Sequence, residues 1–301
     1  MLSLLSLKLI SNSRENSIIF FSEEDTSTLY AYRYFQSGNE RGMEAWVTWT
    51  LTGTIRYHCM LDDALYVVVK NGVKDQLLKF DITLDTTSNF VTSGTDFPVH
   101  LDHSMSVTTA GNTYNSTTGK TTFPKPIGLE SSAQLAAYDN SNNASGVQNL
   151  GRYAKITVNG SNLELDGDWS GETFVIGYLF DMQIQIPTIY LTQQAGENWR
   201  ADTRCDLIIH RIKFNFGNVG VYSITIDKQG KATFTEEREV NQANLSTANN
   251  PNFLQGSFES VPCYERNKTL TVNVSSKHPS PATIYSYNWE GDYNNKNYRR
   301  V

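Results

Sequence analysis

Short runs of alternating apolar and polar residues dominate the chain between residues 17 and 84. The alternation is clearest in the segment YAYRYF at 30–35. Successive side chains of a β-strand point to opposite faces, so the pattern predicts strands, and the Gly, Asn and Asp residues between the runs predict turns. We therefore predict strands at 17–22, 29–35, 44–51, 54–61, 64–70 and 76–84. A set of this size corresponds to one or two propeller blades or half a barrel, so residues 1–84 are predicted to form a propeller-like β region that needs partners.

Residues 85–203 mix strand patterns with polar segments and predict a β platform region with long loops. The segments NTYNSTTGKTT at 112–122 and YDNSNNASG at 138–146 are rich in turn-forming residues and read as long polar loops. Strand patterns lie at 97–107, 153–158, 163–167, 172–180 and 182–192.

Residues 204–301 predict a C-terminal β-sandwich-like region. Its strand patterns lie at 204–216, 221–234, 268–276 and 283–289, with a hairpin turn at Lys228, Gln229 and Gly230. The segment from Glu236 to Asn250 has a poor apolar face and is predicted to be a loop rather than a helix.

The end of the chain is unusually aromatic. Tyr285, Tyr287 and Trp289 are spaced two residues apart, which predicts that they share one face of a strand. Chain termini are usually frayed and polar, so an aromatic end is expected to dock into the fold or onto a neighbouring subunit, unless it is an ordinary last core strand with a polar tail.

Composition supports the same fold class. Aromatic residues make up 12% of the chain and charged residues 19%, and β-branched, aromatic and turn-forming residues are frequent. We predict an all-β chain of propeller-like strands plus sandwich-like platform domains with long polar loops. The net charge of −6 argues against an exterior that grips nucleic-acid phosphates, because such surfaces need clustered Lys and Arg.

Cysteine content and the N-terminus suggest assembly in a reducing cytoplasm. The three cysteines, Cys59, Cys205 and Cys263, lack metal-ligand spacing and form no even disulfide framework, so we expect reduced thiols. The apolar start MLSLLSLKLI is interrupted by Lys8 and lacks a cleavage pattern, so we predict a strand rather than a signal peptide. We expect no membrane span, because no run approaches ~18 apolar residues.

Candidate chemistry is sparse. The segment HLDH at 100–103 would place its two histidines on opposite sides of a strand, which disfavours a metal site. The segment DGDWSGE from Asp166 has half of a calcium-loop pattern, but Gly177 stands where the bidentate Glu belongs, so a tight polar turn is expected. The sequence contains no nucleophile elbow, phosphate-binding loop or dinucleotide-binding glycine motif. We predict no enzyme, catalytic residue, metal or cofactor.

Several segments in order resemble one family. They are YRYFQSGNERGMEAWVTWTLTGTI with the following LYVVVK, then FPVHLDH with YNSTTGKTTFPKP, then ETFVIGYLFDMQIQIPTIYL, and finally YNWEGDYNNKNYRRV. Together they are similar to the tail tubular protein B family, the nozzle proteins of short-tailed bacteriophages (podoviruses), over residues 29–301. Members of that family are usually longer, and the similarity falls in their C-terminal part. The resemblance therefore implies either a fragment or a nozzle built from more than one polypeptide.

The resemblance implies a structural subunit of the virion tail, assembled in the host cytoplasm. It implies a homohexameric ring coaxial with the tail adaptor protein, anchoring tail fibre proteins, through which DNA is ejected without specific binding. The alternative is a carbohydrate-binding or glycan-degrading tail spike protein, since Trp and Tyr platforms also stack on sugars. A cellular lectin-like propeller is a third reading, but the expected internal repeat is missing.

Interface candidates are aromatic or basic residues, the types enriched in protein contacts. Trp46 and Trp49 lie three residues apart, so on a regular strand they face opposite sides and at most one is expected to serve an interface. If the chain lines a DNA channel, the loops at 112–119 and 138–146 are lumen candidates, because they lack Lys and Arg and the second carries Asp139; ordinary exposed loops are the alternative. The structural and interface candidates are Trp46, Trp49, Trp289, Tyr293 and Arg299.

Overall fold

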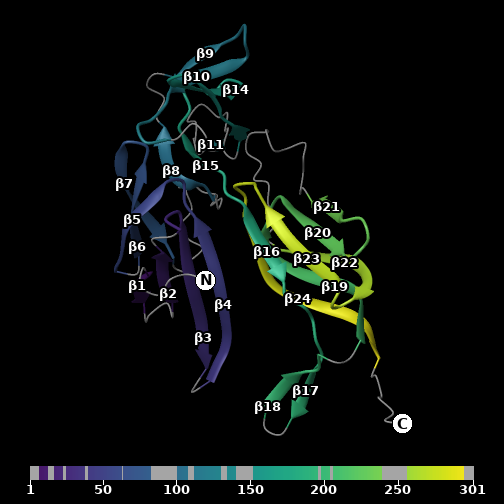
Figure 1. Ribbon diagram of the computed structural model, residues 1–301. Coiled ribbons are helices and arrows are strands. Elements are labelled where there is room, and N and C mark those ends of the chain that lie inside the picture. Colours follow the sequence, from purple (N-terminus) through teal and green to yellow (C-terminus); the bar gives the residue numbers. More distant parts are fainter. Residues whose placement is uncertain are drawn as a thin grey trace, which may run out of the picture. The chain divides into compact units, whose positions relative to one another are not determined.

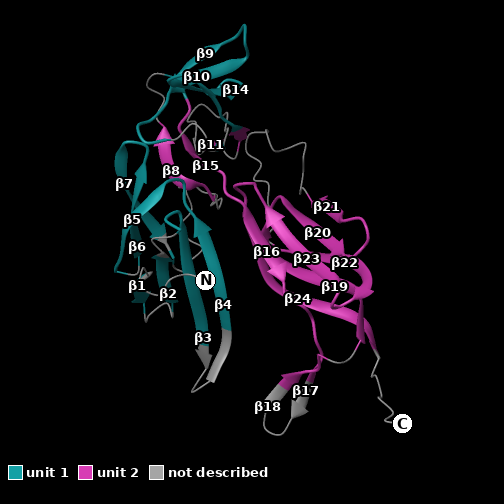
Figure 2. Ribbon diagram, viewed as in Figure 1, with its two compact units in different colours: residues 1–96, 108–135, 155–171 teal, residues 97–107, 136–154, 172–301 magenta. Residues whose placement is uncertain are grey.

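The computed structural model has an all-β fold, which confirms the predicted fold class (Figure 1). It describes residues 7–12, 17–22, 25–37, 40–62, 64–82, 100–107, 112–129, 134–139, 152–195, 198–203, 206–238 and 256–294. The pairing in these ranges is predominantly antiparallel, and no helix occurs among the described residues. The chain divides into two compact units, residues 1–96, 108–135 and 155–171 and residues 97–107, 136–154 and 172–301 (Figure 2).

The first unit begins with two packed sheets. The first has the order β1-β2-β3-β4 and the second the order β5-β6-β7. Both sheets contribute to one core, which includes Ile19, Leu29 and Ala31 from the first sheet and Leu65 and Val67 from the second. The strands are β1 (Leu7–Asn12), β2 (Ser17–Ser22), β3 (Thr28–Ser37), β4 (Glu40–Thr50), β5 (Thr54–Leu61), β6 (Ala64–Asn71) and β7 (Lys74–Asp81).

These seven strands include all six predicted between residues 17 and 84. Within residues 30–35 the smaller side chain, Ala31, faces the core, while Tyr30 and Tyr32 lie on the opposite face. The tight turn between β6 and β7 contains Gly72 with φ of 62°, a conformation that glycine adopts without strain. The two sheets form two layers, and a propeller form for this region remains a prediction.

The first unit also contains a smaller sheet with the order β13-β14-β10-β9. One face of this sheet is buried and includes Thr121, Phe123, Leu163 and Leu165. The predicted loop at 112–122 is wrong in part, because its start forms β9, its end begins β10 and only its tip is a turn. The strands are β9 (Thr113–Asn115), β10 (Lys120–Pro124), β13 (Thr157–Asn159) and β14 (Asn162–Asp166).

A further sheet has the order β12-β11-β15-β8, and its two central strands are buried along their whole length. Gly177 in β15 is required here, because a Cβ atom would lie 2.7 Å from the main-chain oxygen of Asp102. The pairing of β15 with β8 shifts register beside Gly177, and His103 has φ of 52°. The strands are β8 (Asp102–Val107), β11 (Leu135–Asp139), β12 (Tyr153–Lys155) and β15 (Phe174–Tyr178).

The C-terminal part of the second unit is a two-layer β-sandwich. One layer has the order β16-β23-β20-β21 and the other β22-β19-β24. Ile224 and Val274 of the first layer share a core with Phe214, Phe216 and Val261 of the second. The strands are β16 (Met182–Ile186), β19 (Asp206–Val219), β20 (Tyr222–Lys228), β21 (Phe234–Arg238), β22 (Ser257–Arg266), β23 (Leu270–Ser276) and β24 (Ala282–Asn294), and a separate hairpin contains β17 (Thr192–Ala195) and β18 (Asn198–Ala201).

Two sequence predictions for this part need correction. Residues 236–238 continue strand β21 instead of starting a loop, while 239–250 lie outside the described residues. The three aromatic residues of β24 do not share one face: the register shifts around Tyr285, whose side chain is 68% exposed, whereas Tyr287 and Trp289 pack partly against the sandwich core. A β-bulge of this kind inserts one residue and reverses the alternation that follows it.

Candidate interaction surfaces

Five aromatic side chains lie on the solvent side of the β1–β4 sheet. Their rings touch in sequence: Phe20 stacks on Tyr30 at 5.4 Å between centroids, Phe20 meets Trp46 edge to face at 6.0 Å, and Tyr32 lies 4.8 Å from Trp46 and 5.9 Å from Tyr34. We call these five residues the aromatic face. Trp46 is the most exposed of the five, at 66%, whereas the other four side chains are half-buried.

Polar groups hold two rings of the aromatic face in place. Tyr30 donates a hydrogen bond to Oδ2 of Asp25 at 3.1 Å, and Tyr32 donates one to the Glu44 carboxylate. The bond to Asp25 raises the pKa of the Tyr30 hydroxyl above its usual range, because the neutral phenol is the donor. These bonds limit the side-chain entropy that the tyrosines would lose in a contact.

Trp46 and Trp49 occupy opposite faces of β4. Trp49 packs partly against the core of the two sheets and stacks on Phe80 of β7 at 6.0 Å, while Trp46 belongs to the exposed aromatic face. Of these two candidates, Trp46 has the exposed side chain and Trp49 the half-buried one.

The C-terminal candidates lie on β24. Trp289 is partly buried against the sandwich core, and Tyr293 is 40% exposed with its hydroxyl donating to Oδ2 of Asp202 at 3.4 Å. Arg299 lies outside the described residues.

The opposite, solvent-facing side of the β22–β19–β24 layer mixes aromatic and charged groups. Tyr264 is 62% exposed and stacks on His210 at 5.6 Å. Glu290 accepts a hydrogen bond from Lys213, which lowers the pKa of its carboxyl group, and it also pairs with Nε of Arg211 at 3.1 Å. This face is therefore more polar than the aromatic face of the first unit.

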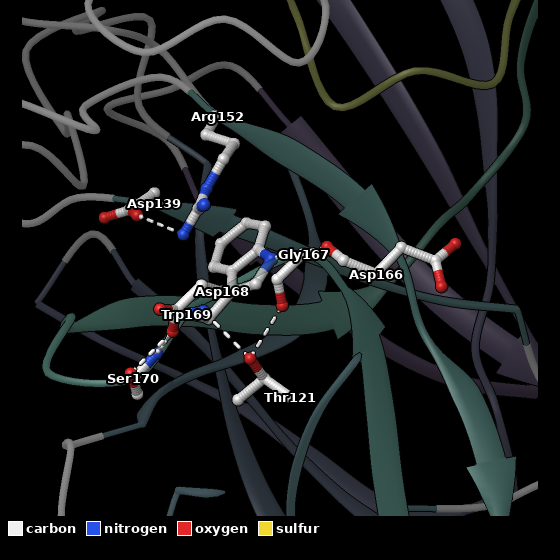
Figure 3. Close-up of polar contacts among 8 residues, drawn as sticks. All are labelled: Thr121, Asp139, Arg152, Asp166, Gly167, Asp168, Trp169 and Ser170. Atoms are coloured by element: carbon white, nitrogen blue, oxygen red, sulfur yellow. Dashed lines mark hydrogen bonds and ion pairs between the residues drawn. The ribbon is translucent and has the colours of Figure 1, made fainter. Parts of the chain in front are cut away.

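The segment at 166–171 forms a tight turn around a buried tryptophan (Figure 3). The hydroxyl of Thr121 accepts a hydrogen bond from the Trp169 main-chain N–H at 2.8 Å and donates one to the carbonyl of Gly167 at 2.7 Å. The indole N–H of Trp169 donates to the carbonyl of Asp166 at 2.9 Å, and Oδ1 of Asp168 accepts from the Ser170 N–H at 2.9 Å. Trp169 is 0% exposed. The turn is a structural element, and sequence analysis missed the burial of its tryptophan.

The segment at 100–103 does not gather metal ligands. Within the described ranges, no group of three or more His, Cys, Asp and Glu side chains could hold a metal ion. His103 meets the ring of Tyr178 edge to face at 5.6 Å, and burial lowers the pKa of its imidazole. Burial also raises the pKa of the Asp102 carboxyl group to about 6.

The raised pKa of Asp102 predicts a pH dependence of stability. The unfolded carboxyl group titrates near 3.8, so between about pH 4 and 6 the folded chain binds more protons and folding weakens as pH rises. Asp102→Asn should raise the free energy of unfolding at pH 7.5 by about 2 kcal/mol and change it little at pH 4. Urea unfolding of both proteins at the two pH values measures this. Equal differences at both pH values would contradict it, since groups common to both proteins cancel.

Asp139 was a candidate for an acidic lumen-facing loop, and the structure contradicts that position. Its side chain is 0% exposed and pairs with Nη2 of Arg152 at 3.4 Å (Figure 3). Asp139 ends the buried strand β11, and only residues 140–146 of the predicted loop lie outside the described residues. By contrast, the tip of the β9–β10 hairpin is exposed at Asn115, Ser116, Thr117 and Thr118, with Oδ1 of Asn115 accepting the Thr117 N–H at 2.9 Å.

The antiparallel sheets and the exposed aromatic face define an all-β protein. Residues 6–300 match the bacteriophage nozzle protein family, so the chain belongs to this family. It is therefore a structural component of a phage tail and part of the virion, and not an enzyme. The match confirms the resemblance inferred from the sequence and extends it toward the N-terminus.

Comparisons with other proteins add little. No match to a curated protein was found for this sequence. A solved structure that is similar in part is the crystal structure of exo-β-1,3-galactanase from Phanerochaete chrysosporium with galactose, at 9% identity, covering 92% of this chain and 79% of that chain with a TM-score of 0.17. That score is too low to carry a conclusion about fold or function. Among the described residues there is no helix that could span a lipid bilayer.

Proposed function

We propose that this chain is the repeating subunit of a nozzle ring through which DNA leaves the virion. In this proposal six copies close a ring that meets the tail adaptor protein on one side and carries contacts for tail fibre proteins. Membership of the nozzle family is the observation that carries the proposal. The exposed aromatic face supports it, because Tyr and Trp are enriched in protein interfaces.

Electrostatics also favour a conduit over a DNA-binding protein. The chain has a net charge of −6, and several of its described cations are paired with carboxylates, including Lys120 with Glu164 at 3.1 Å. Each unpaired Lys or Arg that contacts phosphate adds affinity and would slow the passage of DNA. A lumen poor in cations therefore suits ejection.

A cryo-electron reconstruction of the assembled tail tests this function directly. The expected result is a closed ring of copies of this chain on the tail axis, with few Lys and Arg facing the lumen. A chain that is monomeric in the virion, or a lumen lined with basic side chains, would contradict it.

The β9–β10 hairpin tip offers a more specific prediction about the lumen. If this exposed, uncharged tip faces the DNA, adding cations with Ser116→Lys and Thr117→Lys should slow ejection several-fold at low salt and less at high salt. The rate of DNA release from purified virions, triggered by host cells, measures the effect. Ser116→Gln with Thr117→Gln is the control for side-chain size and should eject normally. Ejection rates that do not change with the added lysines would place the tip away from the DNA.

Glycan binding is the second candidate, and the exposure of Trp46 favours it. A sugar-stacking platform needs rings that lie flat, whereas Phe20 and Trp46 meet at 79° and Tyr32 and Trp46 at 44°. Rings at these angles present edges as well as faces, which suits contact with protein side chains better. Saturable binding of a host polysaccharide to the intact protein, lost in Trp46→Ala, would favour the glycan role instead.

A further inference from the structure

We propose that the outer edge of β4, residues 45–50, accepts strand β24 of a second copy, so that neighbouring subunits join through main-chain hydrogen bonds. The proposal rests on the ring function and specifies the contact that builds the ring. Such strand addition supplies affinity from the backbone and selectivity from alternate side chains.

The ladder with β3 shows which backbone groups of β4 point outward. Opposite residues of an antiparallel pair alternate between hydrogen-bonded and non-hydrogen-bonded pairs. The N–H of Leu51 donates to the carbonyl of Ser27 at 2.8 Å, and the register is regular from that point to Ala45 opposite Arg33. Residues 45, 47 and 49 therefore bond to β3, while residues 46, 48 and 50 direct their N–H and C=O groups away from it. Among the described strands, β4 pairs only with β3.

The 45–50 stretch of the β4 edge lacks the features that normally protect an edge strand. The charged residues of β4 (Glu40, Arg41 and Glu44) and its register shift all lie before this stretch. Native edges carry charges, prolines or bulges that prevent pairing with other chains. The segment AWVTWT at 45–50 has no charge and no proline, and side chains 44–48 are exposed on both faces of the strand. The edge strand β7 of the same unit, in contrast, has four charged residues in eight: Lys74, Asp75, Lys79 and Asp81. The unprotected stretch at 45–50 therefore indicates that this part of the β4 edge is covered in the assembly.

Strand β24 is the occupant that matches this edge best. It spans 13 residues against the 11 of β4, and it pairs only with β19 among the described strands. Its segment ATIYSYNW at 282–289 also lacks charge and proline. Tyr285 is 68% exposed there, so its ring is available for contact with the aromatic face of a neighbour.

A contact between β4 and β24 has the symmetry that a ring needs. Two different surfaces of one chain make a heterologous contact, and heterologous contacts generate rings when the rotation closes. Pairing β4 with its own copy would instead give an isolated dimer. The exposed part of Trp46 (66%) supplies roughly 100–170 Å² of the ~800 Å² per partner of a standard interface. The backbone of the added strand and the rest of the aromatic face supply more.

Thr48→Pro tests the backbone contact in the full-length chain. The N–H of Thr48 points away from β3, so proline removes the bond to a neighbour without removing one within the sheet. We expect the variant to keep its β circular-dichroism spectrum and its melting temperature within a few degrees, and the ring fraction to fall at least tenfold by light scattering on a sizing column. Thr48→Ala keeps the N–H and should assemble normally. Thr48→Lys places a charge on the edge and should also block assembly. It replaces the proline variant as the test if that variant fails to fold.

Cross-linking identifies the occupant. Chains carrying Thr48→Cys and Asn288→Cys, each with its own tag, are produced together and treated with a short bis-maleimide, with the native-cysteine chain as control. A covalent product containing both tags is expected, and each variant alone should give only the background of the control. Self-linking of Thr48→Cys chains, or rings that assemble fully from both Thr48→Pro and Thr48→Lys, would overturn the inference and leave the ring function standing. A native chain that forms no ring under any condition would overturn both.

Discussion

Trp169→Ala should lower the free energy of unfolding of the first unit by about 3–5 kcal/mol, the range for removing a tryptophan from a core. Trp169 is 0% exposed, and its main-chain N–H donates to Thr121 of β10, so loss of its side chain leaves a cavity beside that strand. It also removes the indole N–H that donates to the carbonyl of Asp166 at 2.9 Å. Urea unfolding followed by tryptophan fluorescence and by circular dichroism measures the change.

Trp169→Phe separates the packing effect from the hydrogen bond. Phenylalanine fills most of the cavity but cannot donate to Asp166, so we expect a loss of about 1–2 kcal/mol. If both variants were as stable as the native chain, the turn at 166–171 would not hold the β9–β10 and β13–β14 hairpins together. If the two hairpins unfold before the strands β1–β7 do, the urea unfolding curve should instead show a separate first transition.

The strands with clear alternation were predictable from the sequence because their apolar side chains follow the two-residue period of a buried face. Strand β6 shows this well, with Leu65, Val67 and Val69 all buried between more exposed neighbours. Strand β22 was missed, because only Val261 and Cys263 in its centre are fully buried and Pro262 stands between them. Pro262 is exposed on an edge strand, where its missing N–H costs little.

The departures from alternation depend on contacts distant in sequence. At Tyr285 the pairing of β24 with β19 shifts by one residue, and a Cβ on Gly217 would lie 2.4 Å from the Tyr285 ring, so the ring covers the glycine. Gly177 likewise lies at the register shift between β15 and β8, where its backbone comes close to the main-chain oxygen of Asp102. Neither shift leaves a local pattern in the sequence, because the partner strand is more than sixty residues away in each case.

For the candidate surfaces, the sequence predicted which types of residue take part but not which residues lie together. Spacing alone placed Trp46 and Trp49 on opposite faces of a strand, and the structure has them there. That Trp46 belongs to a cluster with Phe20 and Tyr32 depends on the register of three strands, which the sequence does not state. For Asp139 the sequence was misleading. The residue stands at the start of a polar segment and was expected to be exposed, but its carboxylate is buried and paired with Arg152.

The pair Trp46 and Trp49 allows assembly and stability to be tested separately on one strand. Trp46→Ala should weaken ring assembly by at least 2 kcal/mol, about thirtyfold in the association constant, because exposed tryptophans at interface centres are the commonest hot spots. The same change should cost the isolated subunit only about 1 kcal/mol, since it removes ring contacts with Phe20 and Tyr32 but little burial.

Trp49→Ala is the matched change and should have the opposite effect. Its ring stacks on Phe80 and packs against the core, so removing it should lower the free energy of unfolding by about 2 kcal/mol. Assembly measured below the melting temperature should change less than threefold, because Trp49 faces away from the aromatic face. Sizing-column light scattering over a range of concentrations, together with urea unfolding, gives both quantities for each variant. If Trp46→Ala rings formed as readily as native rings, the aromatic face would not be the subunit contact, whatever the change in stability.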